Sequence, residues 1–246
     1  MKNLIFFLLI GVFLNPPVAR FNGVLHYEND YDMGGATGKI LTTIYEADSK
    51  LRVESENIQT KTPIGQPGTK EQDVLLFDID KQQETHLHDK VKRAIVTPYE
   101  AVLIQEQKMM DSLGITVTVQ NLGNEKLGNY NCTHFVMITA NPKIKSTKAG
   151  VTPGKKDIWI TKDLGSCHVW YVGSYLYYPE GTYLQKKLAD AGADGVVVKW
   201  QTGSGVMLST CTLVSYENKS LPSSDFKVPA DYNTVVPPGM SSLQKN

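Results

Sequence analysis

The chain has 246 residues, of which 41% are hydrophobic and 20% charged, a composition typical of one globular domain or two small ones. Its 25 basic and 25 acidic side chains give a formal net charge of zero, so no basic field is available to hold a phosphate backbone. We therefore expect no nucleic-acid partner.

The first residues have the pattern of a secretory signal peptide. Lys2 precedes an apolar run over residues 4–14, and small residues follow up to Ala19. The run is shorter than the roughly 20 apolar residues that a membrane-spanning helix needs. No cysteine lies near its end to carry a lipid. We expect residues 1–19 to be cleaved, leaving a secreted or periplasmic, non-spanning protein of residues 20–246.

Export would place the three cysteines in a compartment where a disulfide persists. Cys132, Cys167 and Cys211 are an odd number, so at least one thiol stays unpaired in a monomer. Their spacing does not choose among the three pairings, nor between a disulfide and three reduced cysteines. It is too wide for a CxxC redox or zinc motif.

The dominant period along the mature chain is two, which is typical of strands. Alternating stretches bounded by turn-forming residues predict at least nine strands in an antiparallel meander. The predicted strands are 38–47, 50–56, 73–80, 83–89, 91–97, 130–140, 157–163, 195–201 and 205–217.

Two stretches have the signals of helices. Residues 98–114 begin with Pro98 and end with Gly114, and residues 181–192 begin with Thr182 as a candidate cap. No internal repeat or low-complexity segment interrupts the chain. We therefore expect a single domain.

Near its C-terminus the chain reads SLPSSDFKVPADY (220–232). Proline cannot donate to a ladder, so Pro222 and Pro229 suit an edge position. We expect this segment to fasten the edge of the sheet, with Leu221 and Phe226 as its apolar anchors.

Several motifs occur in an order that is also found in a known family. They are a strand start GNYNC (128–132), the strand DIWITKDLG (157–165) and the S-L-P-x-x-x-F-x-V-P-A-x-Y ending (220–232). With FDIDKQQETHLHDK (77–90), they resemble a family of exported bacterial proteins classed as a domain of unknown function, over about residues 21–232. The fold of that family is similar to the lipoprotein-carrier proteins of the Gram-negative envelope.

The resemblance implies a mainly β fold, in which an antiparallel sheet curls into an incomplete, half-open barrel covered by about two helices. It implies no reaction. The concave face of such a sheet would hold an apolar ligand such as a lipid or a lipoprotein acyl chain. Broad or flexible side chains suit an ill-fitting chain better than branched ones do. The residues expected to line this cavity are Met109, Met110, Phe135, Met137, Trp159 and Trp200.

Either face of the sheet could line the concavity. Trp159 alternates with Ile158 and Ile160, and the pattern leaves open which set lines the concavity. An alternative function also stays open: a scaffold or protein-interaction module of the envelope whose core is filled. In that case the bulky aromatic insert between Leu164 and Asp194 would contact another protein.

Two histidines, His86 and His88, are two positions apart and so share one face of a strand, as a metal pair would. Zinc needs at least a third ligand, and nothing nearby in the sequence supplies it. We expect these histidines to face solvent, and we expect no metal site and no cofactor.

Two thiol–imidazole pairs also invite a catalytic interpretation. Cys132 and His134 share a strand face, and Cys167 adjoins His168. No orienting third residue or oxyanion-donating turn accompanies either pair, and no nucleophile elbow, metal-binding helix or phosphate loop occurs. We expect no catalytic residue and no enzyme activity.

Overall fold

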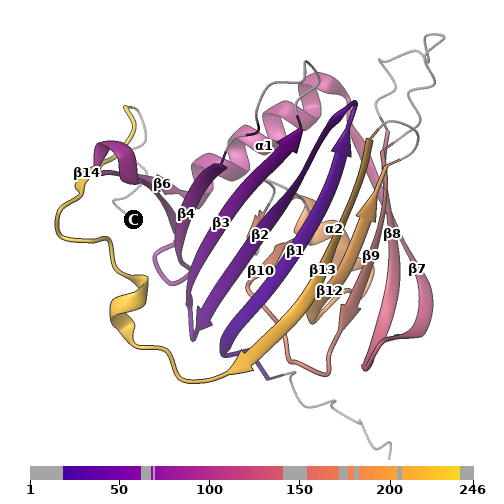
Figure 1. Cartoon of the computed structure of the whole chain (residues 1–246). Coiled ribbons are helices and arrows are strands. Elements are labelled where there is room, and N and C mark those ends of the chain that lie inside the picture. Colours follow the sequence, from indigo (N-terminus) through magenta and orange to yellow (C-terminus); the bar gives the residue numbers. More distant parts are fainter. Residues whose placement is uncertain are drawn as a thin grey trace, which may run out of the picture.

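The computed structural model describes residues 19–61, 68, 70–140, 154–171, 177–179, 183–203 and 207–238. Its main element is a twelve-stranded sheet (Figure 1), which is antiparallel except where β14 pairs with β6. The predicted mainly β, antiparallel class is confirmed. The predicted signal peptide concerns residues 1–19, nearly all of which lie outside the described residues, and stays a prediction.

The hydrogen-bonded order of the large sheet is β14-β6-β5-β4-β3-β2-β1-β13-β12-β9-β8-β7. Its strands in chain order are β1 (Gly23–Met33), β2 (Ala36–Ala47), β3 (Lys50–Lys61), β4 (Lys70–Asp78), β5 (Gln83–His88), β6 (Arg93–Pro98), β7 (Thr116–Leu127), β8 (Tyr130–Ala140), β9 (Gly154–Thr161), β12 (Val196–Thr202), β13 (Met207–Asn218) and β14 (Asn233–Val235). A separate two-stranded sheet consists of β10 (Val169–Tyr171) and β11 (Tyr177–Pro179).

The sheet consists of two meanders, β1 to β6 and β7 to β9, which β12 and β13 connect at the first strand, β1. Strands β1 to β6 follow one another in sequence and in space, as do β7 to β9. β1 pairs with β2 on one side and with β13 on the other, so the strand that starts the domain lies inside the sheet. The order ends at β14 and β7.

The helix α1 (Tyr99–Leu113) connects the two meanders. Pro98 caps its start, and Gly114 ends it with a φ of 64°, a left-handed conformation that favours glycine. The predicted helix 98–114 is therefore confirmed. The shorter α2 (Tyr183–Asp190) lies within the second predicted helix. Short 3-10 helices are η1 (Asp89–Val91) and η2 (Ser223–Phe226).

Figure 1 shows the sheet curving, with α1 and α2 on the side toward which it bends. Leu184 and Leu188 of α2 pack into the main hydrophobic core, and α2 also contacts β7 and α1. Burying these large aliphatic side chains contributes about 1.5–3 kcal/mol each. The concave side therefore contains the core.

The C-terminal tail crosses the opposite face of the sheet. Val228 and Tyr232 pack against a small outer cluster, and the Tyr232 hydroxyl donates to Asp89 Oδ1 at 2.8 Å. β14, which directly follows the predicted segment 220–232, then pairs with β6 as a short edge strand. The predicted anchors, Leu221 and Phe226, lie outside this cluster. The cluster consists of Leu76, Leu87 and Ala94.

Some strands have no counterpart among the predicted nine, namely β1, β7 and the short β10, β11 and β14. β1 carries Asn29, Asp30 and Asp32, residue types that are depleted in strands. It forms a strand nevertheless, because β2 on one side and β13 on the other are hydrogen-bonded to it. β7 is polar and has a bulge near Gly123, whose φ is 101°.

Candidate functional site

The concave face of the sheet is apolar at one end and polar at the other. On β3, Leu51 and Val53 belong to the main core, whereas Ser55 and Asn57, on the same face, line a cavity. On β4 the same change separates Phe77, which is in the core, from the residues toward the strand start. The inner face thus consists of a packed part and an open part.

The open part holds a cavity of about 920 Å³ over β2 to β5, with η1 at one end. Apolar and polar side chains both contribute to its wall. The lining residues are Ile40, Ser55, Asn57, Lys70, Glu71, Gln72, Asp73, Leu75, His86, Leu87, His88, Asp89, Lys90 and Val91.

Hydrogen bonds hold the polar wall in place. The Tyr31 hydroxyl donates to Asn57 Oδ1 at 3.0 Å, and the hydroxyls of Thr42 and Ser55 are 3.2 Å apart. The first pair reaches from β1 to β3 across β2, and the second joins the neighbouring strands β2 and β3. A wall whose groups are fixed in this way is prepared for a ligand without further ordering.

The histidine pair of β5 lines this cavity. The rings of His86 and His88 are tilted against each other with centroids 4.0 Å apart, and His86 Nε2 is bonded to Asp73 on β4. We expected these histidines to face solvent; both line a half-open cavity, and the His86 side chain keeps 36% of its surface exposed. Leu75 of β4 lies directly across from His86.

The two rings differ electrostatically. The hydrogen bond that His86 Nε2 donates to the Asp73 carboxylate raises the pKa of His86 above its ordinary value, while partial burial works against this effect. Burial and the neighbouring charge of His86 lower the pKa of His88. One ring of the pair thus favours the cationic form and the other the neutral form.

The described residues contain no group of three or more histidine, cysteine, aspartate or glutamate side chains arranged to hold a metal ion. His86 and His88 with Asp73 do not meet this condition. Over the same parts of the chain, no helix is long and apolar enough to cross a membrane.

Most of the predicted cavity residues lie in the packed part instead. Phe135 and Trp200 are 1% exposed, Met137 is 4% exposed and Met110 is 6% exposed, and all four belong to the main core. The side chain of Met109 lies outside the described residues. The structure brings these four together, but none of them lines the cavity of β2 to β5.

Trp159 lies on the other face of the sheet, so its predicted position beside Phe135 is wrong. Its register partner on β8 is His134, and Ile158 and Ile160 occupy the core positions of β9. The alternation fitted both assignments, and the face that α2 covers decides between them. α2 covers the isoleucine face.

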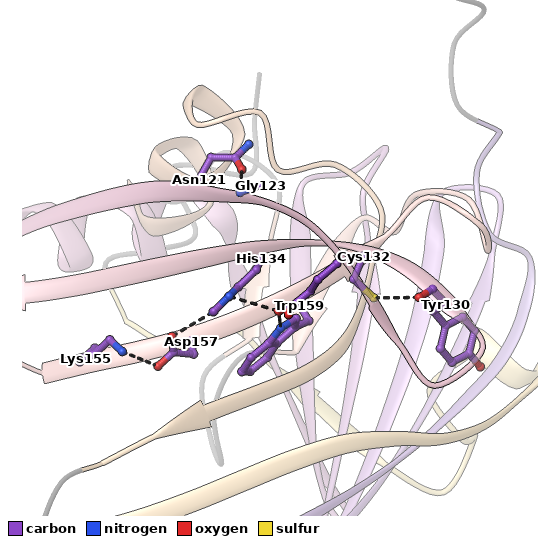
Figure 2. A network of polar contacts seen from close by, with 9 residues as sticks. Asn121, Gly123, Tyr130, Cys132, His134, Lys155, Asp157 and Trp159 are labelled. Atoms are coloured by element: carbon purple, nitrogen blue, oxygen red, sulfur yellow. Dashed lines mark hydrogen bonds and ion pairs between the residues drawn. The ribbon is translucent and has the colours of Figure 1, made fainter.

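Figure 2 shows the polar network around Trp159. The His134 ring stacks on the indole at a centroid distance of 4.4 Å, and its nitrogens lie 3.0 Å from Asp157 and 3.2 Å from Glu125. The indole N–H donates to Glu125, and Lys199 Nζ lies 5.1 Å from the ring centroid on β12. This network joins β7, β8, β9 and β12.

Neither thiol–imidazole pair is assembled. Cys132 contacts the carbonyl of Tyr130, and His134 contacts carboxylates (Figure 2). His168 Nε2 is bonded to the carbonyl of Asp48 at 2.9 Å. The three cysteines are buried free thiols. Burial raises the pKa of Cys132 to about 11 and raises those of the other two, which disfavours the nucleophilic thiolate.

A buried carboxyl is another unusual group of the inner face. Glu46 is fully buried on β2 and accepts the amide N–H of His168 at 3.1 Å. Burial raises its pKa to about 7. It lies beside Leu51 in the ladder, away from the cavity wall.

The polar wall of the cavity was not predicted from the sequence. A signal was present in the first half of β4 and the second half of β3, where polar residues occupy both faces. A strand buried on one face normally keeps an apolar set on that face. Its loss over several residues indicates an inner face that no helix packs against.

Among solved structures, the chain is similar to the lipoprotein LppX of Mycobacterium tuberculosis, with 11% identity, a TM-score of 0.33 and coverage of 82% of this chain and 89% of that chain. LprF from Mycobacterium bovis is 8% identical with a TM-score of 0.34, covering 86% and 90%. A beta-barrel-like protein of the domain of unknown function DUF1849 from Brucella abortus is 9% identical with a TM-score of 0.38, covering 82% and 100%. Likeness at this level does not identify a ligand.

No curated protein matches the chain. A family model matches residues 21–232. This is the range over which the resemblance to a family was expected. The chain belongs to the family described as a domain of unknown function, DUF4412.

Proposed function

We propose that this protein is an exported envelope protein that binds a lipid, or another ligand with an acyl chain, in the cavity over β2 to β5, and that it is not an enzyme. The observation that carries the proposal is the cavity itself. Its volume of about 920 Å³ lies within the range of roughly 300–1,000 Å³ that is usual for ligand sites.

The composition of the wall supports an amphipathic ligand. Leu75 and Ile40 are apolar wall residues; Leu75 packs against the main core, and Ile40 is 2% exposed. Polar side chains such as Asn57 and His88 form the rest of the wall. An acyl chain would contact the first set, and a polar head group would contact the second.

The proposal that the protein binds a ligand without catalysing a reaction rests on the state of the thiols and imidazoles that a nucleophilic catalyst would need. The buried thiols have raised pKa values, and the imidazoles beside them in sequence contact carboxylates or a backbone carbonyl. Location in the cell envelope rests on the signal peptide predicted for residues 1–19.

A second candidate keeps support from the packed part of the sheet. The core around α2 contains Trp200 and Phe135 with almost no exposed surface, as a scaffold or interaction module would. The aromatic insert that would contact a partner lies partly outside the described residues. The two candidates differ in whether the cavity of β2 to β5 is occupied in the purified protein.

Lipid extraction and mass spectrometry of protein purified from the envelope test the proposal, together with binding of a fluorescent fatty acid. The Leu75→Trp variant should obstruct the apolar wall of the cavity and weaken uptake of the probe. The Leu208→Trp variant is the matched control, because Leu208 lies exposed on β13, outside the cavity wall. If wild-type protein carries no lipid and takes up no probe, the binding proposal is wrong and the scaffold proposal is favoured.

A further inference from the structure

We propose that the cavity holds an anionic head group, a carboxylate or a phosphate monoester, at the end where β5 meets η1. This inference rests on the proposed function, because it assigns the polar end of the same ligand. It depends on the basic side chains that converge at that end.

The register brings four basic residues together. His86 and His88 occupy alternate positions of β5, and Lys90 follows in η1, and all three line the cavity. Arg93 on β6 is the register partner of His88, which places it at the same end of the sheet, although it is not one of the wall residues. The charge of Arg93 also acts on His88.

Most carboxylates near this end already have partners within the protein. Asp73 is bonded to His86. Asp89 is bonded to Lys92 and accepts the hydroxyl of Tyr232. Lys70, another basic residue of the wall, is paired with Glu56. Within each ion pair the opposite charges neutralise each other, so these residues leave little net charge to act on a ligand.

The unmatched charge is basic. Neither Lys90 nor Arg93 forms an ion pair with another residue in the described part of the chain. Glu71 on β4 is the remaining wall carboxylate, and it is outnumbered by these two cations and His88. An anionic group placed here gains charge-assisted hydrogen bonds from Lys90 and Arg93, with the His88 imidazole as a further donor.

A neutral head group would gain less from the same wall. Hydrogen bonds to charged donors are stronger than neutral ones by enough to change affinity about tenfold. The position of Leu75 on β4, one step inward from Asp73, gives the attached chain an apolar surface to follow. The head group and the chain thus fit opposite ends of one cavity.

Equilibrium dialysis of the full protein near pH 7 with three radiolabelled probes of equal chain length tests the inference. The probes are oleate, oleyl alcohol and a lysophosphatidate with an oleoyl chain. We expect one or both anions to bind about tenfold more tightly than the alcohol. The ratio of oleate to lysophosphatidate shows whether carboxylate or phosphate is the preferred anion.

Variants connect this preference to the named residues. The double variant Lys90→Gln/Arg93→Gln should bind the anions about tenfold more weakly and the alcohol unchanged. Glu71→Gln should strengthen anion binding. Lys81→Gln is the control, because Lys81 is an exposed lysine at the opposite end of the β4–β5 hairpin and lies outside the wall. Because Lys90 and Arg93 are exposed, the double variant should fold.

Equal affinity of the wild-type protein for oleate and oleyl alcohol would overturn the anionic head group while leaving the cavity as a lipid site. The same holds if the double variant keeps the full preference for anions. If none of the three probes binds, the proposed function fails together with this inference.

Discussion

The packed and open parts of the concave face are built from the same kind of strand but differ in what their inner positions present. In β8, β9 and β12, the inner positions carry Phe135, Ile158 and Trp200, and α2 lies in the same core. In β3 and β4, the inner positions farther from the core along each strand are polar, namely Ser55, Asn57 and Asp73. Only the first region is filled.

The difference shows what allows a cavity to persist in a curved sheet. An apolar helix placed over polar side chains would remove them from water and leave some without partners, at a cost of about 1–3 kcal/mol for each such group. Polar inner positions therefore keep that part of the concave face open. Covered positions become core, and uncovered positions become a candidate site.

The largest expected effect contrasts the two tryptophans of neighbouring strands. Trp200→Ala should destabilise the protein by about 3–5 kcal/mol, because it leaves a large hole in a closely packed core. Trp159→Ala should cost far less, since its ring lies half-buried on the outer face between His134 and Lys199. Urea unfolding of both variants measures this. Equal losses would contradict the assignment of faces.

The next effect concerns the buried carboxyl in the packed part. Because the folded state raises the pKa of Glu46 to about 7 from 4.5, protonated Glu46 stabilises the fold at low pH, and this stabilisation is lost as the pH rises toward 7. The free energy of unfolding should fall by about 3 kcal/mol between pH 4.5 and pH 8.

The variant Glu46→Gln keeps the shape of the side chain and removes its titration. Its free energy of unfolding should lack this decline, so that it exceeds that of the wild type at pH 8. Denaturant melts at several pH values give the comparison. A wild-type protein whose stability rises over this interval would show that Glu46 is paired with a cation in the folded state.

The smallest effect belongs to the open part and is a change in titration. The hydrogen bond that His86 donates to Asp73 raises the pKa of His86, so Asp73→Asn should lower it. NMR titration of the histidine ring protons measures this shift. An unchanged pKa of His86 in the variant would mean that Asp73 does not contact His86 in solution.

Much of the fold could be predicted from local patterns. Alternation predicted the strands with apolar inner faces, and Pro98 with Gly114 predicted the ends of α1. β1 could not be predicted this way, since its many acidic residues are tolerated only because two neighbouring strands pair with it.

The candidate site was harder to predict, because it depends on which face a helix covers. Whether Trp159 or its isoleucine neighbours face the core depends on the curvature of the sheet and on the position of α2. Neither can be deduced from the alternation of side chains along the strand. His86 and His88 were identified as a same-face pair, but their partner Asp73 comes from β4, so only the register reveals it.

The central claim is that ligand occupies the open part and leaves the packed part untouched. NMR of the protein with a spin-labelled stearate tests it most directly, because the label broadens signals of nearby residues only. We predict broadening at Leu75, Ile40 and His88, with the indole signal of Trp200 unchanged. Broadening of Trp200 together with Phe135, while Leu75 stays sharp, would contradict the claim.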